Sequence, residues 1–139
     1  MRARPLVTLT LTTGLLLAAC ATTAPYLEGK TPEQRAEAKE HFHAGTVQYD
    51  LNRYDEAVKE YQAAYAVIAD PSMLYNIAQS YRLGGHPKEA LDAYNQFLHD
   101  KSGLGDDMRK EVSDHIAECL AAMSGAAPST PAPAANPAN

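Results

Sequence analysis

Apolar residues recur at helical spacing through the middle of the chain. Between residues 54 and 68 they follow an i, i+3, i+4, i+7 order, which places them on one face of a helix. The positions in that order are Tyr54, Ala57, Val58, Tyr61, Ala64, Tyr65 and Ile68. Two further runs are Leu74, Ile77, Ala78 and Tyr81, and Ala90, Leu91, Tyr94, Phe97 and Leu98. The pattern predicts a series of amphipathic helices.

Residues that begin or end helices separate these runs. Thr31, Pro32 and Gln34 stand where an N-cap, a first-turn proline and a capping-box partner are expected, so a helix is predicted to begin here. The later breaks fall at Asn52, Asp70-Pro71, Gly84-Gly85, Pro87, Gly103 and Gly105. A fifth helix is expected over 106–123, with an apolar face of Met108, Val112, Ile116, Cys119, Leu120 and Met123.

Small residues and tyrosines repeat at an interval of 33 residues. The pairs at this interval are Gly45 with Ala78, Ala57 with Ala90, and Tyr61 with Tyr94. A small residue lets a neighbouring helix approach closely, and the aromatic ring fills the space beside the contact. The middle of the chain is therefore predicted to be two copies of one helical hairpin.

The second copy is similar to a known repeat family. It carries Leu74, Ile77, Ala78 and Tyr81 on its first helix, then Ala90, Tyr94 and Phe97 on its second. This order of large, aliphatic, small and aromatic residues closely resembles the tetratricopeptide repeat. The first copy departs from it at the start, where His41 and Ala44 stand in place of a bulky pair. The resemblance covers residues 38–98.

The resemblance implies an all-α fold. Two hairpins of the tetratricopeptide type are expected over about 38–70 and 71–103. The helix over 106–123 would close the open end of the stack as a capping helix. The folded domain, a short α-solenoid, would then span 31–123.

The first residues resemble the signal peptide of a bacterial lipoprotein. Arg2 and Arg4 precede an apolar stretch over residues 6–17, which is too short to span a bilayer comfortably. Residues 17–20 then read Leu-Ala-Ala-Cys and resemble a lipobox. An ordinary signal peptide with a chance cysteine is the alternative.

The lipobox implies how the chain would be anchored. Residues 1–19 would be removed, and Cys20 would carry the lipid, palmitate among its acyl chains, at the mature N-terminus. Ala21 follows Cys20 in place of Asp, which by the same resemblance favours the outer membrane, with the domain facing the periplasm. Small and polar residues over 20–30 are expected to act as a short tether.

Charge and composition set the chain apart from nucleic-acid binders. It has 17 acidic and 12 basic residues and a formal net charge of −5, whereas binding to phosphates requires a basic face. All the acids lie between Glu28 and Glu118. The Ala- and Pro-rich tail over 124–139 is expected to be disordered, since it has too little apolar surface to order itself.

Catalytic and metal-binding motifs are not expected. No Gly-rich phosphate loop or nucleophile elbow occurs, so the chain is predicted not to be an enzyme and to need no cofactor. His41 and His43 are two residues apart, which on a helix points them away from each other, so no metal site is expected. Cys119 is expected to be a buried thiol; an intermolecular disulfide is the alternative.

The resemblance implies a function in binding another protein. Positions on the first helix of each hairpin face the ligand in this family. Carried over to this chain, they are Lys39, Phe42, Thr46, Tyr49, Asp50, Tyr75, Asn76, Gln79 and Arg82. Phe42 and Tyr49 could equally be buried. A clamp for a C-terminal carboxylate is not expected, because Phe42 and Thr46 replace its Lys and Asn.

Tyr75, Gln79 and Arg82 form the most specific hypothesis. Their i, i+4, i+7 spacing places them on one helix face, and they are predicted to point outward into a concave groove that docks a partner segment. A merely solvated face is the alternative. Assembly of an envelope machine is the process that the resemblance suggests. The other functional hypothesis is a structural scaffold that completes a short stack by self-association.

Overall fold

The computed structural model describes residues 24–125, which form helices and turns without strands. The elements in order are a 3₁₀ turn η1 (Pro25–Leu27) and five α-helices: α1 (Pro32–Asp50), α2 (Tyr54–Ile68), α3 (Pro71–Leu83), α4 (Pro87–Asp100) and α5 (Asp106–Ser124). The predicted signal peptide over 1–19, Cys20, the start of the predicted tether and the part of the predicted tail beyond residue 125 lie outside the described residues.

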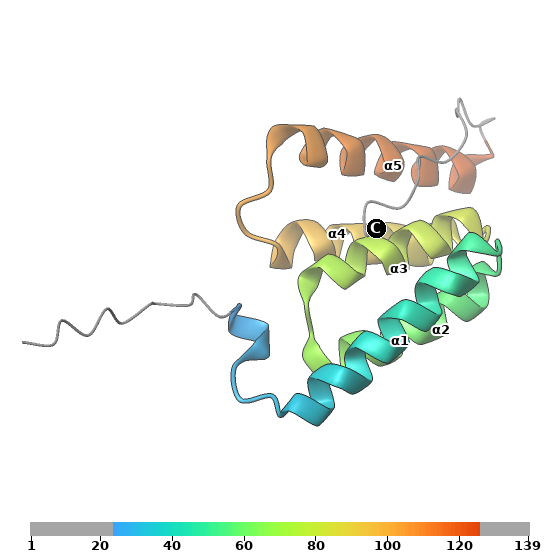
Figure 1. Ribbon diagram of the computed structural model, residues 1–139. Helices are drawn as coiled ribbons and strands as arrows, with labels where there is room; N and C mark the ends of the chain where they lie inside the picture. Colours follow the sequence, from blue (N-terminus) through green and yellow to red (C-terminus); the bar gives the residue numbers. More distant parts are fainter. Residues whose placement is uncertain (1–23, 126–139) are drawn as a thin grey trace, which may run out of the picture.

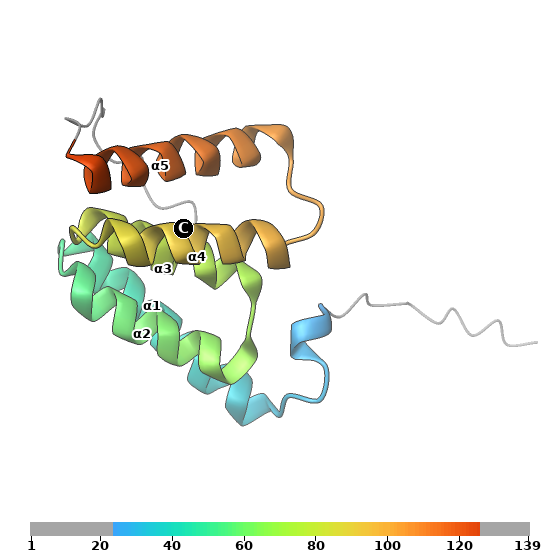
Figure 2. The ribbon, with the colours of Figure 1, turned by 180° about the vertical axis from the view of Figure 1, so that it is seen from behind.

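The helices stack in chain order. α1 pairs with α2 and α3 with α4 as two antiparallel hairpins, and α5 lies along the second hairpin. One side of the stack shows α1 and α3 in front (Figure 1), and the opposite side shows α2 and α4 (Figure 2). The predicted architecture of two hairpins and a terminal helix is confirmed.

The residues predicted to begin or end helices form caps and turns in the structure. The Thr31 hydroxyl accepts a hydrogen bond from the Gln34 amide N–H at 3.2 Å, and the Gln34 side chain accepts one from the Thr31 N–H at 3.0 Å. This capping box satisfies two N–H groups that a helix start leaves unpaired. Asp70 caps α3 by accepting from the Ser72 N–H at 2.9 Å. Asn52 turns the chain between α1 and α2 in a left-handed conformation, with φ 58°.

The repeated small residues and tyrosines form the core. Tyr61 and Tyr94 are fully buried, as are Ala57, Ala78 and Ala90. At Gly45 the approach is so close that an added Cβ would lie 2.7 Å from Tyr61 Cδ1. The packing role predicted for these positions is confirmed, because only hydrogen fits between α1 and the ring of Tyr61.

Polar residues cover the first edge of the stack. Leu74 and Ile77 of α3 are buried. The equivalent places on α1 hold His41 and Ala44, which are only half-buried, and His41 Nδ1 lies 2.7 Å from Glu60 Oε2 of α2. No α-helix precedes α1 within the described residues. This explains the departure of the first copy from the repeat pattern, since a terminal face must be compatible with water.

The last helix is buried only in part. Val112 and Cys119 of α5 join the core, and burial raises the pKa of the Cys119 thiol. Leu120 and Met123 stay about half exposed (50% and 49%), so the prediction that they share the buried face is wrong. The core beneath α5 ends before its last turn. Lys110 and Asp114 pair on the outer side of α5 at 2.6 Å, as suits a capping helix.

The described part of the predicted tether contacts the domain. Pro25–Leu27 form the 3₁₀ turn, and the Arg35 guanidinium of α1 donates to the Leu27 carbonyl at 3.1 Å. Burial and the neighbouring Asp70 carboxylate raise the pKa of Tyr26. Tyr26 and Leu27 therefore lie against the domain, beside Asp70 and Arg35. None of the helices between residues 24 and 125 is long and apolar enough to cross a bilayer.

Candidate partner-binding groove

The predicted binding residues of α3 are mostly buried. Tyr75, Asn76 and Gln79 are only 5%, 8% and 6% exposed, and Arg82 is largely covered. The prediction that Tyr75, Gln79 and Arg82 point outward together is therefore wrong. The i, i+4, i+7 spacing does place them on one face, but α5 lies against that face.

Side-chain pairs join α3 to α5 along their length. Each pair is separated by 36 residues: Tyr75 with Glu111, Gln79 with His115, and Arg82 with Glu118. The constant separation means that the two helices run parallel in register. The Gln79 amide donates to His115 Nε2 at 3.3 Å, and the Arg82 guanidinium donates to the Glu118 carboxylate at 3.0 Å. These contacts attach the capping helix to the second hairpin.

Tyr94 of α4 extends this network into the core. Its hydroxyl donates to Gln79 Oε1 at 2.9 Å, and Arg82 Nη2 donates to the same oxygen at 2.7 Å. The ring of Tyr94 stacks on His115, with 5.7 Å between centroids. Burial, as the largest cause, raises the pKa of Tyr75 and of Tyr94 far above the usual value. Buried polar groups are tolerated here because they are hydrogen-bonded.

The predicted residues of α1 are more accessible. Lys39 and Asp50 are exposed. Phe42, Thr46 and Tyr49 are half-buried. Phe42 and Tyr49 were predicted to face a ligand or to be buried, and each ring is partly packed. The ring centroid of Phe42 lies 5.4 Å from that of Tyr61, and the centroid of Tyr49 lies 5.6 Å from that of Tyr54.

Thr46 belongs to the same contact. Its hydroxyl donates to the Phe42 carbonyl at 3.1 Å and accepts from the Tyr61 hydroxyl at 3.3 Å. Its side chain therefore links the main chain of α1 to the buried Tyr61 of α2.

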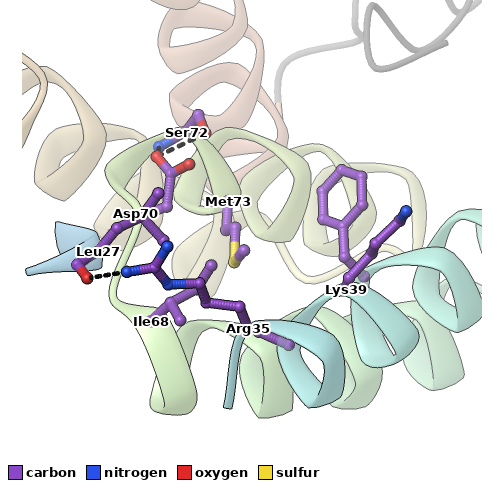
Figure 3. Close-up of a pocket in the computed structure, with 9 residues that line it drawn as sticks. Leu27, Arg35, Lys39, Ile68, Asp70, Ser72 and Met73 are labelled. Atoms are coloured by element: carbon purple, nitrogen blue, oxygen red, sulfur yellow. Dashed lines mark hydrogen bonds between the residues drawn. The ribbon is translucent and has the colours of Figure 1, made fainter. Parts of the chain in front are cut away.

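Two adjoining cavities open beside Phe42. The first, of about 330 Å³, lies between η1, α1 and the start of α3 (Figure 3); it is lined by Leu27, Arg35, Ala38, Lys39, Phe42, Ile68, Asp70, Ser72 and Met73. The second, of about 310 Å³, is lined by Phe42, Ser72, Tyr75, Asn76, Phe97, Lys101, Leu104 and Met108. Phe42 and Ser72 line both, so the cavities adjoin, and the two together are called the groove below.

Several residues that line the groove were not predicted from the sequence. Phe97, Lys101, Leu104 and Met108 lie at the end of α4, in the next loop and on α5, and no local pattern marks them as lining residues. The side-chain contacts between α3 and α5 do have a signal in the sequence. Glu111, His115 and Glu118 of α5 repeat the i, i+4, i+7 spacing of the trio on α3. Within residues 24–125, no three His, Cys, Asp or Glu side chains gather to hold a metal ion.

Comparison with known proteins identifies the second hairpin. Residues 72–100 match the tetratricopeptide repeat family. The matched segment covers almost all of α3 and α4. This supports the tetratricopeptide assignment and, with the packed hairpins, a short solenoid of that type. No curated protein and no solved structure matches the chain.

Proposed function

We propose that this protein is a lipid-anchored interaction module that docks a segment of a partner protein in the groove. The tetratricopeptide match over residues 72–100 carries the proposal, because such repeats serve as interaction scaffolds more often than as enzymes. The groove adds a place for the partner. It is concave, mostly apolar and bordered by a few polar groups, as binding sites for ligand segments commonly are. A role in assembling envelope machinery is part of the same proposal.

The groove residues Lys39 and Lys101 provide a direct test in cells. A photo-crosslinking amino acid placed at either position is expected to capture the same partner protein from living cells. Lys59 is the matched control, since it is an exposed lysine on α2, outside the groove lining. Crosslinks of equal yield from position 59, or none from the groove positions, would argue against docking in the groove.

Anchoring is the second element of the proposal, and the lipobox supports it. The lipid would be attached to Cys20 and place the domain at the periplasmic face of the outer membrane. Several acyl chains would give firm attachment, because each buried CH₂ contributes about 0.8 kcal/mol.

Replacing Cys20 with Ala is expected to abolish lipid attachment. The thiol is the proposed acylation site, so the Cys20→Ala chain should keep residues 1–19 and take up no labelled palmitate. Metabolic labelling and mass spectrometry of the N-terminus measure both effects. Cys119→Ala is the control and should label normally. Palmitate in the Cys20→Ala chain would exclude the lipobox interpretation.

A further inference from the structure

Asn76 is a buried polar side chain that lines the groove without a hydrogen-bond partner. Only 8% of the residue is exposed, and its amide makes no hydrogen bond to the other described residues, although Ser80 donates to its main-chain carbonyl. The nearby side chains of Tyr75 and Gln79 are both hydrogen-bonded. The amide is not sealed from solvent but opens into the groove, so its donor and acceptor are free to pair with a ligand.

The walls around Asn76 are largely apolar. Phe42, Phe97, Leu104 and Met108 line the same cavity, and Met73 lines the adjoining one with Ile68 and Leu27 (Figure 3). Two cavities that meet at Phe42 can each accept one large apolar side chain. Because the two cavities adjoin, the two apolar side chains that fill them would lie close together in the sequence of one ligand.

The groove lining carries more basic than acidic side chains. Lys39 lines one cavity and Lys101 the other, and neither ammonium group makes a hydrogen bond or an ion pair with residues 24–125. The one acidic lining residue, Asp70, already accepts hydrogen bonds from the Ser72 N–H and hydroxyl at 2.9 and 2.7 Å. In a chain with a net charge of −5, two unpaired lysines at one depression favour an anionic ligand.

We propose that the groove binds a linear segment of a partner protein in which large apolar residues flank an acidic residue. The Asn76 amide pairs with a peptide bond, which offers both a donor and an acceptor, and Lys39 and Lys101 attract the acidic side chain. A fatty acid would fit the lysines and apolar walls but would leave the Asn76 carbonyl without a donor. The tail of this chain over 126–139 carries no acidic side chain. This inference rests on the proposed function and specifies its partner.

Selection from a random dodecapeptide library displayed on phage, with the full chain as bait, tests this inference. We expect enriched peptides to carry an acidic residue between large apolar ones. Synthetic copies should bind the Lys39→Glu, Lys101→Glu double variant at least about tenfold more weakly. The control variant Lys59→Glu, Lys88→Glu makes the same charge change on α2 and α4, and its affinity should stay within about twofold.

Asn76→Ala tests the buried amide. We expect it to weaken peptide binding by about tenfold while the melting temperature stays close to that of the unchanged chain. If that variant fails to fold, the lysine double variant still decides the matter, because Lys39 is exposed, Lys101 is half-buried and neither belongs to the core.

Three results would overturn the inference. If the peptides bind the lysine double variant with unchanged affinity, they dock outside the groove. If the enriched peptides are basic or uncharged, the charge argument is wrong. Displacement of the peptides by micromolar oleate together with stoichiometric oleate binding would assign the groove to an acyl chain. In each case, the proposed interaction function would still hold if crosslinking captured a partner. Only a failure of crosslinking would count against that function.

Discussion

Raising the pH above about 10 is expected to unfold the domain steeply, because Tyr75 and Tyr94 are held neutral in the folded state. Burial raises the pKa of both phenols well above the value of about 10 that they have in an unfolded chain. A group whose folded pKa is raised contributes its full stability below the unfolded pKa. That contribution is lost as the pH rises towards the folded pKa, since only the unfolded chain then releases the proton.

The expected loss is large compared with the stability of a small domain. Each of the two tyrosines lowers the free energy of unfolding by about 1.4 kcal/mol per pH unit above pH 10. Together they remove about 4 kcal/mol by pH 11.5, against a total that is typically about 5–15 kcal/mol. Urea unfolding followed by circular dichroism at pH 9, 10 and 11.5 measures the slope.

A variant and a second signal make this test specific. Tyr75→Phe should reduce the slope, because one of the proton releases that favour the unfolded chain is gone. Phenolate absorbance at these two rings should appear only together with the loss of helical signal. Ionisation of Tyr75 or Tyr94 in a chain that remains helical would show that burial does not hold that phenol neutral.

Gly45→Ala is expected to destabilise the domain although alanine is the better helix former. The substitution gains up to about 1 kcal/mol in helix propensity. The new Cβ would lie 2.7 Å from Tyr61 Cδ1 and 2.8 Å from Cε1, and Tyr61 is fully buried and cannot move aside. Overpacking typically costs about 1–3 kcal/mol. The net loss should lower the melting temperature by about 4–8 °C for each kcal/mol.

A matched glycine and a second substitution separate packing from helix propensity. Gly105→Ala places a Cβ where no other atom lies within 4 Å; because Gly105 is the N-cap of α5, we expect only the small loss of a poorer cap and no overpacking. Replacing Tyr61 with Leu removes the ring that blocks the new methyl group. Gly45→Ala should therefore cost less in the Tyr61→Leu background than alone. An equal cost in both backgrounds would mean that Tyr61 does not set the requirement for glycine.

Helix positions and the repeat could be predicted from the sequence because their causes are local. The capping box at Thr31, the cap at Asp70 and the turn at Asn52 act over a few residues, so each one appears in the sequence itself. The interval of 33 residues between Gly45 and Ala78 also reports a physical requirement, the close approach of helices. These signals together determined an all-α stack of two hairpins and a terminal helix.

The tertiary structure decided which faces of these helices stay accessible. Tyr75, Gln79 and Arg82 share one side of α3, as their spacing predicted, but the sequence does not show that α5 covers that side. Polar side chains can be buried when partners from a distant segment satisfy them, and Glu118 of α5 is such a partner for Arg82. Periodicity reports that a face exists. Only long-range packing determines what lies against it, and here it leaves Asn76 unpaired at the groove.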